Sequence, residues 1–229
     1  MPPLNLVGDF GGGGMLLAVG VLSAVLEARV SGRGQVVDAA MVDGAALLTT
    51  VQHELRAMGR WSDERGANLT DGGAPFYDTY ETADGEFVAV GAMEPEFFAA
   101  LVTLTGLDPS DADSYLDEAR WPGLRAGLAA AFRTRTRDEW AVLAETVDAC
   151  VAPVLSLADA PGHPYNRARQ VFVDVGGWLE PAPAPRFSRT ASGPPRPGPR
   201  RGQDTDDVLA EAGFSKPEIE RLRATGVLR

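Results

Sequence analysis

The 229-residue sequence predicts an α/β protein with a large α/β domain and a smaller α+β domain. Residues 1–70 combine strongly apolar helical patterns with a short apolar strand pattern. Residues 75–155 differ in texture, because an aromatic and β-branched hairpin pattern precedes further helices. We therefore assign residues 1–70 to the large domain and residues 75–155 to the small domain.

The bulk composition is that of an ordinary globular chain, with 45 % hydrophobic and 23 % charged residues. A net charge of −11 argues against a nucleic-acid partner, since a surface that neutralises phosphates needs excess Lys and Arg. The single cysteine, Cys150, excludes an internal disulfide and indicates a reducing compartment, so we expect a cytoplasmic protein. We expect Cys150 to be a buried structural thiol.

Residues 15–28 predict a helix that is apolar on nearly every face and therefore buried on several sides. Its apolar run, residues 15–26, is too short to span a membrane, so no membrane partner is expected. After a glycine turn, residues 35–41 predict a short buried strand, and residues 42–56 predict a second helix.

The small domain begins with a hairpin prediction, in which strands 76–81 and 86–92 are joined by the turn TADG. Pro95 then opens a helix that runs to about residue 105, since proline suits the first helical turn. A capping box formed by Thr136 and Glu139 precedes a helix to about residue 147.

Residues 156–202 are predicted to be a return segment, starting near 152–157, and a proline-rich linker. The stretch 181–202 is rich in proline, and its arginines are interpreted as part of a solvated tether. Residues 203–229 are predicted to form C-terminal helices that pack on the large domain, the second of them with a Ser215/Glu218 capping box.

One carboxylate, Asp9, stands just before a run of four glycines in NLVGDFGGGGMLL. It could form a turn, cap the helix that begins near residue 15, or act as a catalytic base beside a backbone that a substrate approaches. The local pattern leaves all three interpretations open.

A second carboxylate, Glu94, lies between a predicted strand and the helix opened by Pro95. Strand ends that lead into helices often carry site residues in α/β proteins. Glu is a poor N-cap, and the helix dipole at that end favours a charged carboxylate. The pattern leaves a surface carboxylate and a site residue equally open.

The stretches NLVGDFGGGGMLLAVGVLSAVLEARVSGRGQVVDAAMVDGA and GGAPFYDTYETADGEFVAVGAMEPEF resemble the α-methylacyl-CoA racemases of the family III CoA-transferase superfamily. The resemblance runs from about Pro3 to the C-terminus and weakens in the proline-rich stretch. It implies a family III CoA-transferase-like fold, in which residues 1–70 are the remainder of an incomplete large α/β domain that accompanies the smaller α+β domain. It also implies racemisation of 2-methyl-branched acyl-CoA thioesters by α-proton transfer through an enolate. No metal or redox cofactor is implied, and coenzyme A enters only as part of the substrate.

The resemblance also assigns roles to residues. Asp9 matches one catalytic base of the racemases, and Glu94 matches a glutamate that assists a histidine base. Substrate-binding positions are expected at Asn5, Gly11, Gly12 and Tyr77, with the glycines allowing the substrate to approach main-chain N–H donors.

The family's histidine base lies upstream of the GDFGGG motif, and neither His53 nor His163 matches it. We therefore expect the C-terminal part of a racemase with little activity alone, whose apolar faces at 15–26 and 42–48 promote association. The resemblance implies an interlocked homodimer in which Asp9 and Glu94 meet across chains. Two alternatives remain: a CoA transferase with Asp9 as nucleophile, or a dimerising remnant without activity. The EPxF glutamate favours the racemase, because the transferases usually lack it.

Overall fold

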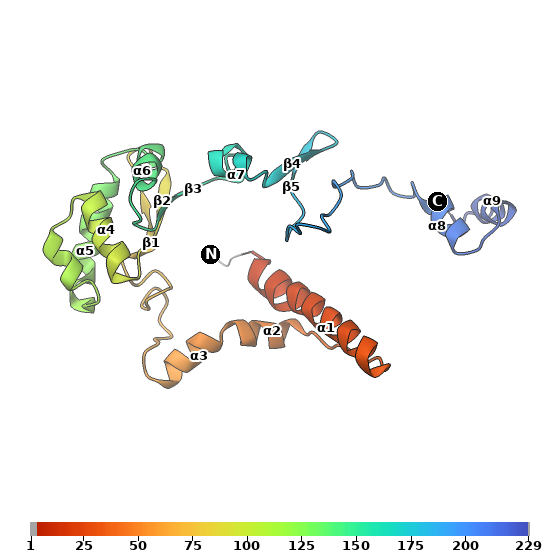
Figure 1. Ribbon diagram of the computed structural model, residues 1–229, viewed down its shortest axis with the longest axis horizontal. Coiled ribbons are helices and arrows are strands. Elements are labelled where there is room, and N and C mark those ends of the chain that lie inside the picture. Colours follow the sequence, from red (N-terminus) through yellow and green to blue (C-terminus); the bar gives the residue numbers. More distant parts are fainter. Residues whose placement is uncertain (1–3, 229) are drawn as a thin grey trace. The chain divides into compact units, whose positions relative to one another are not determined.

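The computed structural model describes residues 4–228 and divides the chain into two compact units, Met1–Val154 and Leu155–Arg229 (Figure 1). The first unit contains a three-stranded sheet and the second a two-stranded sheet. Helices accompany strands in both units, which confirms the predicted mixed architecture.

Residues 6–31 form one continuous helix, which begins well before the predicted start near residue 15. Its first part, η1 (Leu6–Met15), is π-helical, and α1 (Leu16–Ser31) continues as an α-helix. Gly32 ends the helix in the left-handed conformation with φ of 76°. The glycine run is therefore helical rather than a loop.

The glycines of η1 have a packing role. Gly12 and Gly13 are its buried residues, and they face α2 (Met41–Leu48). A Cβ on Gly44 of α2 would stand 1.8 Å from the Gly12 carbonyl oxygen. Only glycine at position 44 permits this approach of two backbones.

Two further predictions for the N-terminal segment are wrong. Residues 33–40 form no strand, since no described strand lies beside them to satisfy their backbone groups. The single helix predicted over 42–56 is two helices, α2 and α3 (Thr50–Ala57), separated at Thr49. The Thr49 hydroxyl donates to the carbonyls of Ala45 and Ala46, a local bond that competes with a regular helix.

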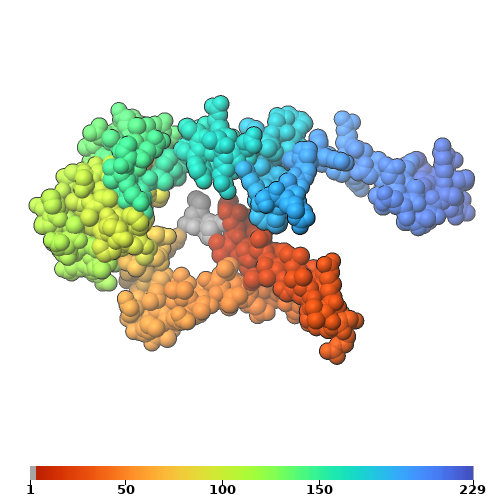
Figure 2. Space-filling view, in the orientation of Figure 1, coloured from red at the N-terminus to blue at the C-terminus, as the bar shows by residue number. Residues whose placement is uncertain are grey.

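The helix 6–31 is not buried as predicted. None of the α1 residues is buried, and exposed apolar side chains follow α1 and α2. Figure 2 shows the surface of these helices in red and orange. These side chains are Leu17, Val19, Val21, Leu22, Val25, Leu26, Val30, Met41, Val42, Leu47 and Leu48.

The same helix is longer than the apolar run suggested. It has 26 residues and a mean hydropathy of 1.7, so it is the one described helix long and apolar enough to cross a membrane. This is a statement about length and composition alone, and the core helix of a soluble protein satisfies it equally.

The sheet of the first unit is antiparallel, with β1 (Tyr77–Glu81), β2 (Phe87–Gly91) and β3 (Val151–Val154) in that spatial order. Tyr77 pairs with Gly91 and Glu81 with Phe87, which confirms the predicted hairpin. The predicted return segment supplies β3, which pairs with β2.

Helices α4 (Pro95–Thr105), α5 (Trp121–Phe132) and α6 (Arg137–Ala144) complete the core around this sheet. Short 3-10 helices η2 (Pro109–Asp113) and η3 (Glu118–Arg120) precede α5. The largest fully buried side chains are Phe76, Phe98, Phe132, Leu101, Leu128 and Val88. Helix α4 and the capping box of α6 are confirmed, whereas α5 was not predicted.

The second unit contains η4 (Ala160–Gly162), α7 (Pro164–Ala168) and a hairpin of β4 (Phe172–Val175) and β5 (Trp178–Pro181). Gly176 and Gly177 form its turn with positive φ, as a two-residue hairpin turn requires. Neither α7 nor this hairpin was predicted. Residues 182–200 are irregular, and α8 (Thr205–Glu211) and α9 (Lys216–Ala224) follow with the predicted capping box.

Candidate active site

Asp9 lies inside η1, in the first turn of the helix, and its side chain is exposed. The N-cap position belongs to Asn5, so the turn and capping interpretations of Asp9 are wrong. No described residue donates a hydrogen bond to the Asp9 carboxylate. π-Helical segments are rare and frequently occur at functional sites.

The predicted substrate-binding residues of this segment differ in their surroundings. Asn5 is exposed, its side chain makes no capping bond, and its carbonyl accepts a hydrogen bond from the Phe10 amide at 3.2 Å. A Cβ on Gly11 would lie 3.4 Å from the Leu6 carbonyl oxygen, and Gly12 packs on α2.

The expectation that the glycine run offers free N–H donors is wrong. Amides within a helix bond to preceding carbonyls, and only those of the first turn lack a helical partner. In η1 the first bond comes from Phe10, so the free amides belong to Leu6–Asp9. These amides belong to the same helical turn as Asp9.

Glu94 is the N-cap residue of α4, with extended backbone (φ −83°, ψ 148°), but its side chain makes no capping bond. Its carboxylate is exposed, and no described residue donates a hydrogen bond to it. The backbone around it is fixed, since the Glu94 carbonyl accepts the Phe98 amide at 2.9 Å. Glu94 is therefore an anchored residue with an uncommitted carboxylate.

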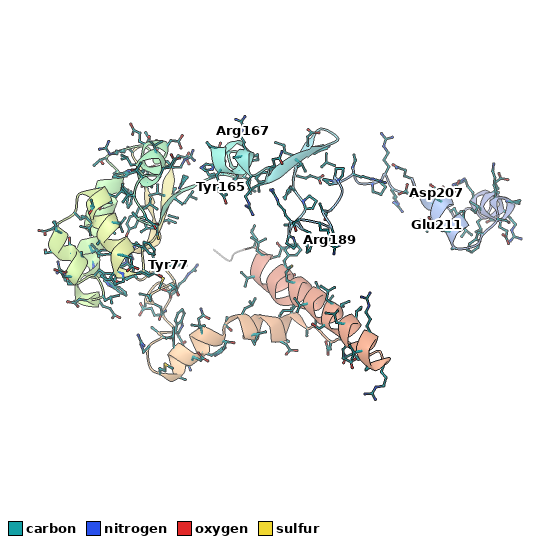
Figure 3. All side chains as sticks on the ribbon, viewed as in Figure 1. Tyr77, Tyr165, Arg167, Arg189, Asp207 and Glu211 are labelled. Atoms are coloured by element: carbon teal, nitrogen blue, oxygen red, sulfur yellow. The ribbon has the colours of Figure 1, made fainter. Side chains whose placement is uncertain are left out.

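Tyr77 begins β1 at the end of the hairpin that leads to Glu94 (Figure 3). It pairs with Gly91, and its ring atom Cε2 lies 4.0 Å from the place of a Cβ on that glycine. The Ala92 amide donates to the Phe76 carbonyl at 3.0 Å and closes the hairpin there. The structure thus brings Tyr77 to the same end of the hairpin as Glu94, and the ring remains 39 % exposed.

Asp9 and Glu94 are not brought together within the described chain. Helix η1 packs on α2, and α2 contacts α3, while Glu94 is the N-cap of α4 in the hairpin and helix core. No hydrogen bond or ion pair of the described residues joins the two. His53 is exposed on α3, and His163 is the N-cap of α7.

The structure adds two residues that the sequence did not indicate. Arg125 of α5 donates to the Asp78 carboxylate and to the carbonyls of Gly72 and Gly73, at 2.7 and 2.9 Å. It thereby joins α5 to the segment that leads into β1. Tyr115 donates its hydroxyl to the Met93 carbonyl at 2.9 Å, directly before Glu94. Neither had a local signal, because both contacts join residues far apart in the sequence.

The expectation that Cys150 is buried is wrong. The residue is exposed and has a φ of 49°, just before β3, while its carbonyl accepts the Gly91 amide at 2.9 Å. Partial desolvation of the sulfur and the nearby carboxylates of Asp148 and Glu94 raise the thiol pKa. A protonated thiol is a weak nucleophile.

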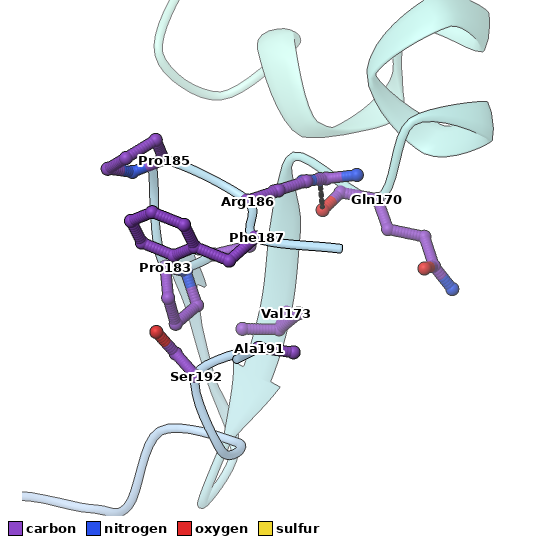
Figure 4. A pocket seen from close by; sticks show the side chains of 9 residues that line it. Gln170, Val173, Pro183, Pro185, Arg186, Phe187, Ala191 and Ser192 are labelled. Carbon is purple, nitrogen blue, oxygen red and sulfur yellow. Dashed lines mark hydrogen bonds between the residues drawn. The ribbon is translucent and has the colours of Figure 1, made fainter. Parts of the chain in front are cut away.

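Other candidate sites lack the required chemistry. Among the described residues, no group of three or more His, Cys, Asp or Glu side chains could hold a metal ion. A hollow of 280 Å³ in the second unit is lined by Gln170, Val173, Ala182, Pro183, Pro185, Arg186, Phe187, Ala191 and Ser192 (Figure 4). No Asp, Glu or His side chain lines this hollow. Its one charged group, Arg186, donates to the Gln170 carbonyl at 2.7 Å.

The chain combines helices and strands, and its two candidate carboxylates, Asp9 and Glu94, lie at helix starts. The CoA-transferase family III pattern matches residues 3–205. The chain belongs to CoA-transferase family III.

The similar curated proteins include α-methylacyl-CoA racemases. The chain is 44 % identical over 229 residues to that of Mus musculus, covering 99 % of this chain and 60 % of the relative. It is 38 % identical over 228 residues to that of Homo sapiens, with the same coverage. The chain thus spans about 60 % of the length of these relatives.

Among solved structures, a CAIB/BAIF family protein from Brucella suis superposes with a TM-score of 0.67 at 22 % identity. The match covers 87 % of this chain and 54 % of that protein. It confirms the family III fold class predicted from the sequence.

Proposed function

We propose that this chain is the C-terminal part of an isomerase that racemises 2-methyl-branched acyl-CoA thioesters. The observation that carries the proposal is a pair of uncommitted carboxylates, Asp9 and Glu94, in a chain 44 % identical to such a racemase over its length. Because the chain covers only 60 % of the length of these racemases, we expect it to have little activity alone.

The chemistry assigns one step to Asp9. Its carboxylate takes the α-proton of the thioester, and the electron pair of the C–H bond moves to the carbonyl to give an enolate. The free amides of the first turn of η1, which contains Asp9, can donate to the enolate oxygen. A second acid returns a proton to the opposite face of the α-carbon, so the configuration is lost.

Glu94 supports that second acid. A base on the other face must have the opposite protonation state, and one carboxylate cannot fill both roles. We propose that Glu94 orients a histidine that lies outside the 229 residues. Neither a metal nor a redox cofactor takes part, and coenzyme A is present only as part of the substrate.

A second copy of the chain is the proposed partner. Asp9 and Glu94 have no contact within one chain, and a homodimer allows them to meet across copies. The exposed apolar faces of α1 and α2 supply surface for association. We further propose a cytoplasmic location. We propose neither a nucleic acid nor a membrane as partner, since a net charge of −11 is repelled by the phosphate groups of nucleic acids and of lipids.

The experiment is α-hydrogen exchange in deuterated water with a 2-methylacyl-CoA of one configuration. Mass spectrometry measures deuterium incorporation, and chiral analysis measures loss of configuration. We expect little exchange from the 229-residue chain and ready exchange once the upstream coding segment with its histidine is joined to it. Absence of exchange from the extended form rejects the racemase.

A CoA transferase is the second candidate, because the family as a whole carries that name. Its Asp9 would form a covalent acyl or CoA intermediate rather than accept a proton. Intact-protein mass spectrometry after mixing with acyl-CoA distinguishes the two: an adduct lost in Asp9→Asn indicates the transferase. If neither the adduct nor α-hydrogen exchange is observed, the chain is a dimerising remnant without activity.

A further inference from the structure

We infer that Tyr115 is a positioning residue that holds the backbone of Glu94 in place through the Met93 carbonyl. The inference rests on the role proposed for Glu94 and extends it to a residue 21 positions further along the chain. Tyr115 itself touches neither substrate nor reacting atoms in this assignment.

Both peptide groups of Glu94 are held by buried residues. The Tyr115 hydroxyl donates to the Met93 carbonyl at 2.9 Å, which fixes the peptide group before Glu94. The Phe98 amide donates to the Glu94 carbonyl at 2.9 Å, which fixes the peptide group after it. The rings of Tyr115 and Phe98 stack with centroids 4.5 Å apart and planes 13° apart. The two supports of Glu94 therefore support each other.

Tyr115 is itself fixed on its other sides. It is 6 % exposed, and the Trp121 indole donates to its carbonyl at 2.9 Å. Phe76 meets its ring edge to face at a centroid distance of 5.0 Å. Aromatic contacts of this kind resist displacement, because the surrounding core is close-packed.

The hydroxyl remains a donor at the pH of the reaction. Burial raises the pKa of Tyr115, and the negative charges of Glu94 and Glu96 raise it further. The phenol is therefore protonated across the physiological range, and the bond to Met93 persists there.

This arrangement suits a carboxylate that must orient another group. A capping bond would fix Glu94 but would occupy its oxygens, and no such bond is present. Support through the main chain fixes the Cα while both oxygens stay free. Small misplacements of such a group lower the rate strongly, since positioning supplies much of the catalytic advantage.

The test is Tyr115→Phe, which removes one oxygen and keeps the ring. A matched control is Tyr80→Phe, because Tyr80 is also buried, stacks on Phe132 and donates its hydroxyl to a carbonyl, that of Pro75. In the form that exchanges the α-proton, we expect Tyr115→Phe to lower kcat about tenfold with KM unchanged. Tyr80→Phe should lose similar stability and keep its kcat.

The double variant with Glu94→Gln separates positioning from general weakening. If Tyr115 acts through Glu94, Tyr115→Phe has no further effect on kcat in the Glu94→Gln background. An unchanged kcat for Tyr115→Phe, or the same loss in both backgrounds, overturns the inference. Full kcat in Glu94→Gln instead rejects the role of Glu94, and with it any positioning for catalysis.

A second measurement does not depend on activity. Amide hydrogen exchange of the 229-residue chain should be about tenfold faster over residues 93–98 in Tyr115→Phe than in Tyr80→Phe. Should no form exchange the α-proton, the proposed function fails, and this measurement alone decides whether Tyr115 fixes Glu94. Equal protection of residues 93–98 in the two variants shows that it does not.

Discussion

At the scale of single residues, the two carboxylates are distinguished by what they lack. Asp9 and Glu94 both stand at helix starts, and neither uses its side chain to cap the helix. By contrast, Thr136 and Asp108 are N-cap residues, as Glu94 is, and their side chains make the expected capping bonds. A carboxylate without a hydrogen-bond donor among the described residues is available for chemistry.

Asp9→Asn tests the base directly. The amide keeps the shape of the side chain but cannot accept the proton, so α-hydrogen exchange by the extended form should fall about a hundredfold to ten-thousandfold. The melting temperature should be unchanged, because no described residue bonds to the carboxylate. Asp43→Asn is the control, since Asp43 is an exposed first-turn carboxylate of α2 and should retain full exchange. Normal turnover in Asp9→Asn removes Asp9 from the catalytic set.

At the scale of elements, the helix starts of the first unit depend on local charge as well as on packing. In the capping box of α6, the Glu139 carboxylate accepts bonds from the Thr136 amide and hydroxyl at 2.8 and 3.0 Å. The bond from the Thr136 amide lowers the pKa of Glu139 most, and the bond from the Thr136 hydroxyl lowers it further. The N-terminus of α9 has a capping box of the same kind as the N-terminus of α6.

The capping box predicts a pH dependence. Because the folded pKa of Glu139 is depressed, its stabilisation is present above the unfolded pKa and is lost as the pH falls through the folded pKa. Glu139→Gln should therefore flatten the fall in unfolding free energy between about pH 5 and pH 3. Urea unfolding at several pH values measures this. Glu145→Gln, an exposed carboxylate at the other end of α6, should leave the slope unchanged.

The crossing of η1 and α2 gives a second prediction at this scale. Gly44→Ala places a Cβ against the Gly12 carbonyl, so the helices must separate, at a cost of about 1–3 kcal/mol. We expect faster amide exchange across both helices. Gly34→Ala is the control, because no atom lies within 4 Å of its added Cβ and its φ is not positive. Unchanged protection in Gly44→Ala contradicts the close contact.

At the scale of the whole molecule, the main feature is the exposed apolar surface of α1 and α2. Exposed Leu and Val side chains follow α1 and α2, whereas the sheet and α4–α6 enclose a continuous core. A continuous apolar surface of this kind promotes association in water. The match to the family protein from Brucella suis covers 54 % of that protein, so the matched chain corresponds to a part of that architecture.

Self-association should therefore depend on α1. We expect concentration-dependent oligomers of the 229-residue chain in light-scattering measurements, and Leu22→Glu with Leu26→Glu should shift them toward monomers. Both side chains are more than half exposed, so the substitutions leave the core intact. Val142→Glu on α6 is the control, at 65 % exposure. If the α1 substitutions leave association unchanged, another surface mediates it.

The sequence by itself determined the elements that carry their own local signals. The TADG turn gave the β1–β2 hairpin, Pro95 the start of α4, and the capping boxes at Thr136 and Ser215 the starts of α6 and α9. Each signal lies within a few residues of the structure it specifies. The two candidate carboxylates were found in the same way.

Only the tertiary structure decided features that depend on residues far apart. Residues 35–41 had the composition of a strand but no neighbouring strand among the described residues, and the helix that contains the glycines after Asp9 packs Gly12 against Gly44. Tyr115 reaches Met93 across 22 positions. Sequence patterns record what a segment prefers, whereas strand pairing, backbone crossings and side-chain supports are settled by the partner that folding brings to it.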